Sequence, residues 1–260
     1  MDISALDTLD SLGAGKKIIA LPQSNLPTYL TIYKNSPYLS IDQFDHPNLE
    51  LIKENQADLI ITGDITADVY HSLAKIAPVL SLNIDTQHYR QSIEHNINLL
   101  AILTQKPMLA KEYLNQLNTQ ITDVNQKAKL SSLTATVARY EHGQLILAEN
   151  SIQAAFIHEL LGVKRVKNAS EAKPTSLETA QLNKNTPVIL DNQYFEQHPT
   201  DLLFIVDVDK ATNQSNDTHS SLTKLRGTQI IYLEPVRWVF APWGIDNLKQ
   251  QVLEISTYLK

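Results

Sequence analysis

The chain has 260 residues, enough for one large domain or two modest ones, and its 43% hydrophobic and 19% charged content is typical of a globular protein. The net charge of −6 argues against a nucleic-acid or anionic-membrane partner, and the absence of cysteine excludes disulfides, thiolate metal sites and cysteine nucleophiles. No apolar run approaches the roughly 18 residues of a membrane-spanning helix, and the first residues lack the pattern of a signal peptide.

Strand and helix patterns alternate through the first hundred residues. We expect buried strands at 17–21, 58–62 and 79–83, and helices at 2–12, 29–33, 48–55, 67–76 and 89–103. Gly13 or Gly15 ends the first helix, and Asn48 is placed to cap the helix that follows it. This alternation predicts a parallel α/β sheet, in which the loops after the strands share one edge.

A long amphipathic helix is predicted from Pro107 to about Leu130, near the middle of the chain. Its apolar residues recur in steps of three and four, and Pro107 suits a first helical turn. A helix of this length is about 33 Å long, the width of a small domain. We interpret it as a connector between two lobes, which implies a cleft between them. The alternative is a long surface helix on a single domain.

The strand and helix pattern starts again after residue 131. We expect a hairpin of 133–140 and 144–148 turning at His142-Gly143, helices at 152–161, 192–197 and 245–259, and buried strands at 201–207 and 229–233. The polar stretches 168–185 and 209–221 are predicted to be surface loops. The predicted domains are therefore an N-lobe (residues 1–106), a connecting helix (107–130) and a C-lobe (131–260).

Enzyme and cofactor motifs are absent from the sequence. It contains no GxGxxG, GxxxxGK[ST], HExxH or GxSxG pattern, and no nucleophile and base in a common context. The eight histidines are scattered without an i, i+4 pair on one face, so we expect no metal site. These absences predict a protein that is not an enzyme and has no cofactor of its own.

Several blocks resemble the periplasmic iron-siderophore binding proteins that serve ABC importers. The blocks are "DISALDTLDSLGAGKKIIALPQSNLPTYL", "NLELIKENQADLIITG", "AFIHELLG", "PTDLLFIVD" and "QIIYLEPVRWVFAPWGIDNL", and they occur in order over almost the whole chain. The resemblance implies two α/β lobes joined by one long helix, with the ligand in the cleft between them. It also implies a strand before the first helix, whereas this chain starts at that helix, which leaves one more open sheet edge.

The resemblance breaks down at the positions that grip an anionic ferric catecholate. Family members use arginines from both lobes, and some add a histidine and a tyrosine to bind the iron. By placement on the blocks, these five positions carry Asp64, Gln153, Val208, Lys184 and Val239. A standard ferric tris-catecholate pocket is therefore not expected.

Other residues near the predicted cleft edge could bind a ligand instead. Aromatic rings beside arginines suit a planar, partly anionic ligand, and an aspartate could accept hydroxyl or cationic groups. Together with Gln153 and Lys184, the candidates are Ser24, Asn25, Asp64, Arg139, Tyr140, Arg237, Trp238, Phe240 and Trp243.

Each candidate also has a purely structural interpretation. Trp238 could pack in the core, Arg237 could form a surface ion pair, Asp64 could cap the next helix, and Arg139 could point to solvent.

The leading hypothesis is a monomeric, periplasmic or lipid-anchored binding protein that captures a ferric siderophore or related chelate for an ABC permease of the inner membrane. Acidic residues on the lobes, with Asp68 and Glu196 as candidates, would face basic permease loops. The alternative is a diverged binding protein that carries another solute or acts as a scaffold.

Overall fold

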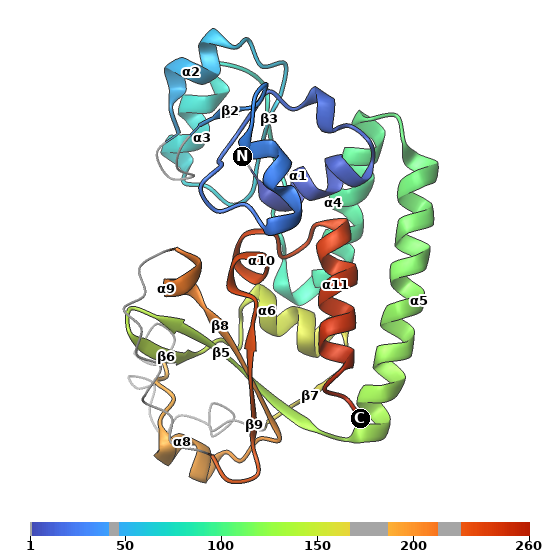
Figure 1. Cartoon of the computed structure of the whole chain (residues 1–260), viewed down its shortest axis with the longest axis vertical. Helices are drawn as coiled ribbons and strands as arrows, with labels where there is room; N and C mark the ends of the chain where they lie inside the picture. The colour runs from blue at the N-terminus through green and yellow to red at the C-terminus, as the bar shows by residue number, and fades with distance from the viewer. Residues whose placement is uncertain (1, 42–46, 167–186, 213–224) are drawn as a thin grey trace, which may run out of the picture.

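The computed structural model describes residues 2–41, 47–166, 187–212 and 225–260. Figure 1 shows two lobes stacked along the long axis, with α5 running beside both. Among the described helices, none combines the length and apolarity needed to cross a membrane.

The N-lobe is built from short strands and the helices that follow them. Side-chain caps begin its helices: Asp2 accepts from the Ala5 N–H, and Asn48, as predicted, accepts from the Leu51 N–H. Gly13, at a φ of +72°, follows the first helix. The elements are α1 (Ile3–Ser11), η1 (Gly15–Lys17), β1 (Ala20–Leu21), η2 (Thr28–Lys34), β2 (Leu39–Ser40), α2 (Leu49–Glu54), β3 (Ile60–Thr62), α3 (Ala67–Ala74), β4 (Val79–Ser81), η3 (Thr86–His88) and α4 (Tyr89–Leu103).

The described strands of the N-lobe form two separate pairs. β1 pairs with β2 and β3 pairs with β4, and both pairs are parallel. No described strand joins β1 to β3. The predicted parallel pairing is confirmed, but the sheet is divided in the middle.

The long helix is confirmed as α5 (Pro107–Ser131), which has 25 residues and is followed by Ser132 in the left-handed region, at a φ of 56°. Its buried residues are Ala110, Leu117, Ile121, Val124 and Ala128. They belong to a core cluster that includes residues of α1, α4 and the C-lobe. The helix is therefore packed along its length, and the lobe boundaries at 106/107 and 130/131 stay a prediction.

The C-lobe contains a five-stranded sheet in the order β6-β5-β8-β9, with β7 also paired to β5. The predicted hairpin is confirmed as β5 and β6, and β8 and β9 extend the sheet in parallel. The elements are β5 (Thr134–Glu141), β6 (Gln144–Leu147), α6 (Ile152–Ala154), the π-helical η4 (Ala155–Leu160), β7 (Lys164–Arg165), α8 (Asn192–Gln197), β8 (Leu202–Asp207), α9 (Val208–Ala211), β9 (Gln229–Leu233), α10 (Pro235–Phe240) and α11 (Ile245–Ser256).

Two short helices lie outside the predicted helical segments. Asp209 lies in α9, whose first turn is capped by the Asp207 carboxylate. The segment after β9 forms α10, because the Glu234 side chain accepts from the Val236 and Arg237 N–H groups and Pro235 occupies the first turn. The rest of the predicted loops at 168–185 and 209–221 lies almost wholly outside the described residues.

Candidate functional site

The carboxyl ends of strands from both lobes lead toward the space between the lobes (Figure 1). In the C-lobe, β8 leads into α9 and β9 leads into α10 on this side. In the N-lobe, the segments after β1 and β3 carry Ser24, Asn25 and Asp64. Loops at the carboxyl ends of parallel strands are the usual ligand-binding positions of α/β folds.

A buried carboxylate joins the lobes beside this space. Asp7 of α1 accepts hydrogen bonds from the backbone N–H groups of Asp246 and Asn247, at 2.9 and 3.0 Å, in the first turn of α11. The carboxylate thereby satisfies donors that a helix start leaves unpaired. Burial nevertheless raises the pKa of Asp7 to about 6. Helix α11 of the C-lobe is therefore bonded directly to helix α1 of the N-lobe.

Tyr29 and Arg237 face one another across the two lobes. The Tyr29 hydroxyl donates to the Asp7 carboxylate at 2.6 Å, and the Arg237 guanidinium carbon lies 6.0 Å from the centre of the Tyr29 ring. Tyr29 is 39% exposed, so part of its ring faces solvent. Among the described residues, no hydrogen bond is recorded for the Arg237 guanidinium, whose Nε is buried. The guanidinium can therefore donate to an anionic ligand without breaking an internal ion pair.

The N-lobe candidates are accessible. Ser24 and Asp64 are exposed and Asn25 is half-buried. Asp64 does not cap the next helix, because the Thr66 hydroxyl takes that position in α3. These three side chains remain candidates for polar contacts with a ligand.

Three C-lobe candidates have structural partners. Arg139 forms an ion pair with Glu141 at 2.7 Å, and Tyr140 packs against the cluster around Phe195. The Gln153 amide donates to the Trp238 carbonyl at 2.9 Å. Gln153 therefore orients α10, and in this structure it does not serve as a free ligand contact.

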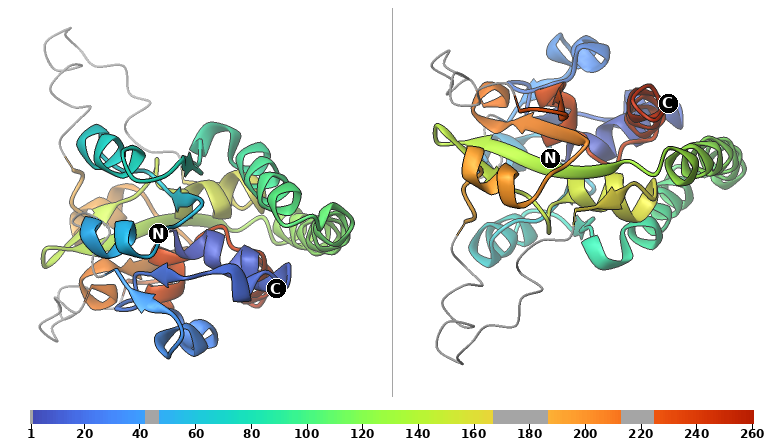
Figure 2. Two further views of the ribbon diagram at one scale, coloured as in Figure 1. Left: turned by 90° about the horizontal axis from the view of Figure 1, so that it is seen from above. Right: turned by 90° about the horizontal axis from the view of Figure 1, so that it is seen from below.

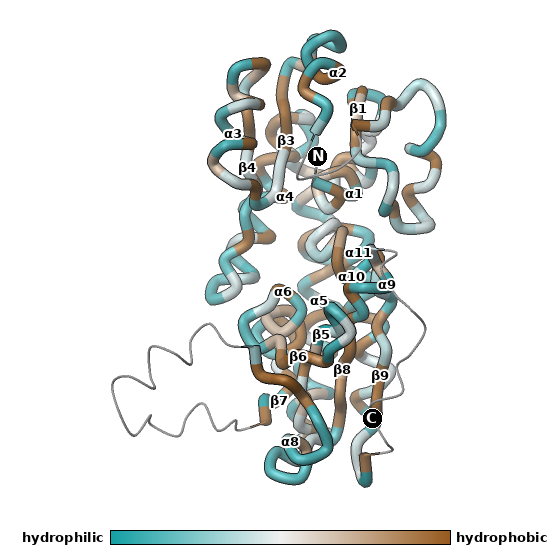
Figure 3. The backbone as a smooth tube through the Cα atoms, turned by 90° about the vertical axis from the view of Figure 1, so that its left-hand side faces the viewer, coloured by the Kyte–Doolittle hydropathy of each residue, from teal (hydrophilic) through white to brown (hydrophobic). Residues whose placement is uncertain are grey.

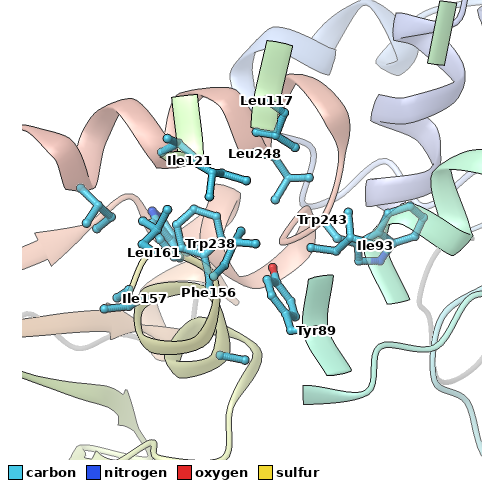
Figure 4. Packing of buried hydrophobic residues seen from close by; sticks show 14 of the residues in the cluster. Tyr89, Ile93, Leu117, Ile121, Phe156, Ile157, Leu161, Trp238, Trp243 and Leu248 are labelled. Carbon is cyan, nitrogen blue, oxygen red and sulfur yellow. The ribbon is translucent and has the colours of Figure 1, made fainter. Parts of the chain in front are cut away.

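The two tryptophans belong to the core and do not form the predicted aromatic wall. Trp238 and Trp243 are 1% and 2% exposed, and Figure 4 shows them among the packed side chains of the core. Trp238 packs edge-on against Phe156 and donates its Nε1–H to Glu254 at 2.9 Å. With both rings covered, no tryptophan face is left for a ligand to stack on.

Phe240 and Lys184 are the last two ligand-binding candidates. Phe240 is half-buried and packs against the N-lobe cluster around Tyr33, so it supports the contact between the lobes. Lys184 lies outside the described residues.

The two proposed docking carboxylates are exposed on separate helices. Asp68 is in the first turn of α3, and Glu196 is in α8. Figure 1 places both helices on the side away from α5, one in each lobe. Their use in docking stays a prediction.

Within the described ranges, no group of three or more His, Asp or Glu side chains is arranged to hold a metal ion. His158 is a half-buried histidine whose ring Nδ1 lies 2.8 Å from the Val163 carbonyl oxygen. Burial lowers its pKa to about 4. A ring held this way stabilises the local fold.

Three residues at the junction of the lobes are not among the candidates from the sequence. They are Asp7, Tyr29 and Asn247. Asp7 follows Ile3 by four residues and so lies on the same helical face as an apolar residue. A carboxylate on an apolar face is the signal that could have identified it.

Two α/β lobes and one long helix give the chain the fold of the TroA-like periplasmic binding proteins. A TroA-like periplasmic binding protein from Xylanimonas cellulosilytica superimposes with a TM-score of 0.78 over 98% of this chain and 86% of that chain, at 20% identity. No protein-family model matches the sequence.

The relatives of this chain are siderophore-binding proteins. It is 24% identical over 271 residues to the petrobactin-binding protein YclQ of Bacillus subtilis, covering 100% of this chain and 81% of that protein. The crystal structure of that protein has a TM-score of 0.86 at 23% identity and covers 100% of this chain and 90% of that chain. The ferric-anguibactin-binding protein FatB of Vibrio anguillarum is 23% identical over 263 residues, covering 96% of this chain and 78% of that protein. These findings confirm the resemblance found in the sequence blocks.

Proposed function

We propose that this protein is the solute-binding component of an ABC importer and holds a ferric siderophore, or a related iron chelate, between its two lobes. The observation that carries the proposal is the likeness to siderophore-binding proteins over the full chain, in sequence and in fold. A structure of BauB with two molecules of acinetobactin and ferric iron, similar at a TM-score of 0.82 and 20% identity, supports it.

Arg237 is the residue we assign to the anionic part of the chelate. Ferric complexes of catecholates carry several negative charges, and a guanidinium can donate to two of their oxygens at once. The Arg237 position beside the exposed Tyr29 ring places a cation next to an aromatic face at the lobe junction. Ser24, Asn25 and Asp64 supply neutral and acidic polar contacts from the opposite lobe.

The lobes are expected to close only modestly on the ligand. α5 is packed along its length, and the Asp7 contact ties α1 to the start of α11. Large hinge motions would break these buried contacts, so a largely preformed site is favoured.

The proposal also includes a permease partner, a location and an oligomeric state. Delivery requires an ABC permease, which Asp68 and Glu196 would contact on the exposed surfaces of the lobes. The protein would act outside the inner membrane, as a periplasmic or lipid-anchored monomer, and would bind its solute without chemical turnover.

A diverged specificity is the second candidate, and two specific positions favour it. The acidic Asp64 occupies a position where the family resemblance implies an arginine, and Gln153 is engaged with the Trp238 carbonyl at another. Such a site would accept a chelate with fewer negative charges or a different solute.

A thermal-shift panel tests these proposals. The protein is heated with ferric petrobactin, ferric acinetobactin, a ferric hydroxamate, ferric citrate and haem, and with each iron-free chelator as the control. The main proposal expects a rise in Tm with at least one ferric chelate of the panel that exceeds the rise with its iron-free form. A rise in Tm confined to the citrate, haem or hydroxamate members shows in addition that the site no longer accepts ferric catecholates, as the second candidate expects. No shift with any member contradicts iron-chelate binding.

A further inference from the structure

Two helices of the C-lobe lie directly against the N-lobe. Figures 1 and 3 place α10 and the start of α11 beside α1, and the view from above in Figure 2 shows these red helices beneath the blue first segments of the chain. Helix α10 carries Arg237, the residue that we assign to an anionic ligand. The side chains around Arg237 at this junction therefore decide where its charge is presented.

The backbone of Arg237 is fixed by α10 and α11. Its N–H donates to the Glu234 carboxylate at 2.6 Å, and its carbonyl accepts from the side-chain amide of Asn247 at 3.3 Å. Asn247 is buried, so this anchor lies inside the protein. The guanidinium, however, is at the end of a long flexible side chain, and a fixed backbone does not by itself fix its position.

Two carboxylates of the C-lobe lie near Arg237 but are engaged with other donors. Glu234 caps the first turn of α10, and Glu254 accepts from the Trp238 Nε1–H at 2.9 Å. Burial raises the pKa of Glu254, and the charge of Arg237 opposes this shift. Within the described ranges, no ion pair joins Arg237 to either carboxylate. The guanidinium is therefore not held by a charge of its own lobe.

An aromatic ring of the N-lobe faces the guanidinium instead. The centre of the Tyr29 ring is 6.0 Å from the guanidinium carbon of Arg237, a distance at which the negative face of a ring attracts a cation. This attraction restricts the guanidinium without occupying its N–H donors, as an ion pair would. The ring can thus hold the cation in place while leaving the donors for a ligand.

The Tyr29 ring is itself held by a buried carboxylate. Its hydroxyl donates to Asp7 at 2.6 Å, and the same carboxylate accepts from two backbone N–H groups at the start of α11. Burial, together with the charge of Asp7, raises the pKa of Tyr29 far above its usual range, so the hydroxyl stays a donor. A short hydrogen bond to a buried anchor leaves the ring few orientations.

We propose that Tyr29, tethered by Asp7, is a positioning residue that holds the Arg237 guanidinium in place for the ligand. This role rests on the proposed function, because Arg237 acts in it as the ligand contact. An arginine that is already ordered loses less side-chain freedom when it binds, so the affinity for an anionic ligand is higher. Two residues of the N-lobe thereby set the position of a cation of the C-lobe.

The test is a double-mutant cycle on the full chain, measured by calorimetric titration with ferric petrobactin and with ferric acinetobactin. Tyr29→Leu removes the ring and should weaken binding about threefold to tenfold. In an Arg237→Ala background, the same substitution should change the affinity by less than about twofold, because no guanidinium is left to position. The matched control is Tyr70→Leu, since Tyr70 of the N-lobe is 39% exposed, as Tyr29 is, and should leave the affinity unchanged.

A second variant tests the tether. Tyr29→Phe keeps the ring and removes only the hydroxyl, so its affinity should lie between those of the wild type and Tyr29→Leu. It also completes the cycle with Arg237→Ala if thermal unfolding without ligand shows that Tyr29→Leu does not fold. An affinity of Tyr29→Phe equal to that of the wild type overturns the role of Asp7.

The outcomes separate this role from the proposed function. If the wild type binds a ferric chelate and Tyr29→Leu binds it equally well, or loses the same factor with and without Arg237, Tyr29 does not position Arg237 and the proposal is overturned while solute binding stands. An unchanged affinity for Arg237→Ala overturns the proposal as well. If the wild type binds neither chelate, the ligand role of Arg237 and the positioning role of Tyr29 fail together.

Discussion

The Asp7 carboxylate of one lobe caps the first turn of the last helix, where it accepts from the Asn247 N–H at 3.0 Å. The two residues are 240 positions apart in sequence. The contact needs Gly244, because a Cβ at that position would overlap the Asp7 carboxyl group. The lobes are therefore held together by a specific polar contact as well as by α5.

Stability should depend on pH through this carboxylate. Burial raises the pKa of Asp7 to about 6 from the ordinary 3.8, so the folded chain holds the proton more tightly than the unfolded chain. Its contribution to stability is fully present below the unfolded pKa and is lost as the pH rises through 6. Between pH 4 and pH 7, the free energy of unfolding of the wild type, measured in urea, should fall by roughly 2–3 kcal/mol relative to that of Asp7→Asn. Comparison with the variant cancels the opposite contribution of His158, and a pH-independent difference would contradict the expectation.

Gly244→Ala should destabilise the junction between the lobes. The added methyl group would overlap the Asp7 carboxyl, and overpacking of this kind costs about 1–3 kcal/mol. The matched control is the same substitution in an Asp7→Ala background, where the overlap is absent. Equal costs in the two backgrounds, measured by urea unfolding, would show that the Asp7 contact is not the reason for the glycine.

Substitutions on the buried face of α5 should lower the free energy of unfolding, whereas substitutions on its exposed face should leave it almost unchanged. Leu117 is buried against α11 and its neighbours, whereas Leu130 is 85% exposed. Leu117→Ala should lower the free energy of unfolding by about 2–5 kcal/mol, and Leu130→Ala by less than about 0.5 kcal/mol. If the two substitutions cost the same in urea unfolding, α5 is not part of the continuous core.

Arg237 should matter for binding more than for folding. Arg237→Ala removes the guanidinium beside Tyr29 and should weaken binding of an anionic ferric chelate at least about tenfold, with a smaller loss for Arg237→Lys. Arg165→Ala is the matched control, since Arg165 lies in an exposed ion pair with Glu159. Calorimetric titration measures all three variants, and an unchanged affinity for Arg237→Ala would remove this residue from the site.

Periodicity was sufficient to predict the elements that are long or buried. The α5 helix, the β5–β6 hairpin and β8 follow from apolar spacing, because their burial depends on a regular pattern. Helix α10 is not among the predicted helices, although a Glu234-Pro235 start is a helix signal, because its aromatic residues are interpreted as candidates for ligand binding. The division of the N-lobe sheet could not be predicted, since strand pairing is decided by partners distant in sequence.

The site was harder to predict than the fold for a physical reason. Trp238 and Trp243 are near Arg237 in the sequence and were therefore candidates for ligand contact. Their large rings are buried in the core, where they cannot contact a ligand. Asp7 contacts Asp246, which is 239 residues away in the sequence, and Tyr29 contacts both Asp7 and Arg237. Local spacing carries no information about such distant contacts. Arg237 lies beside Tyr29 at the junction of the lobes, and its role in ligand binding stays a prediction.

The central claim is the capture of an iron chelate, and equilibrium dialysis with radio-iron-labelled petrobactin or acinetobactin tests it most directly. We expect saturable retention of one ferric chelate complex per chain with a Kd of roughly 1 μM or tighter, which iron-free chelator in excess does not displace fully. Absence of saturable retention for both labelled chelates at roughly 100 μM would contradict the proposed function.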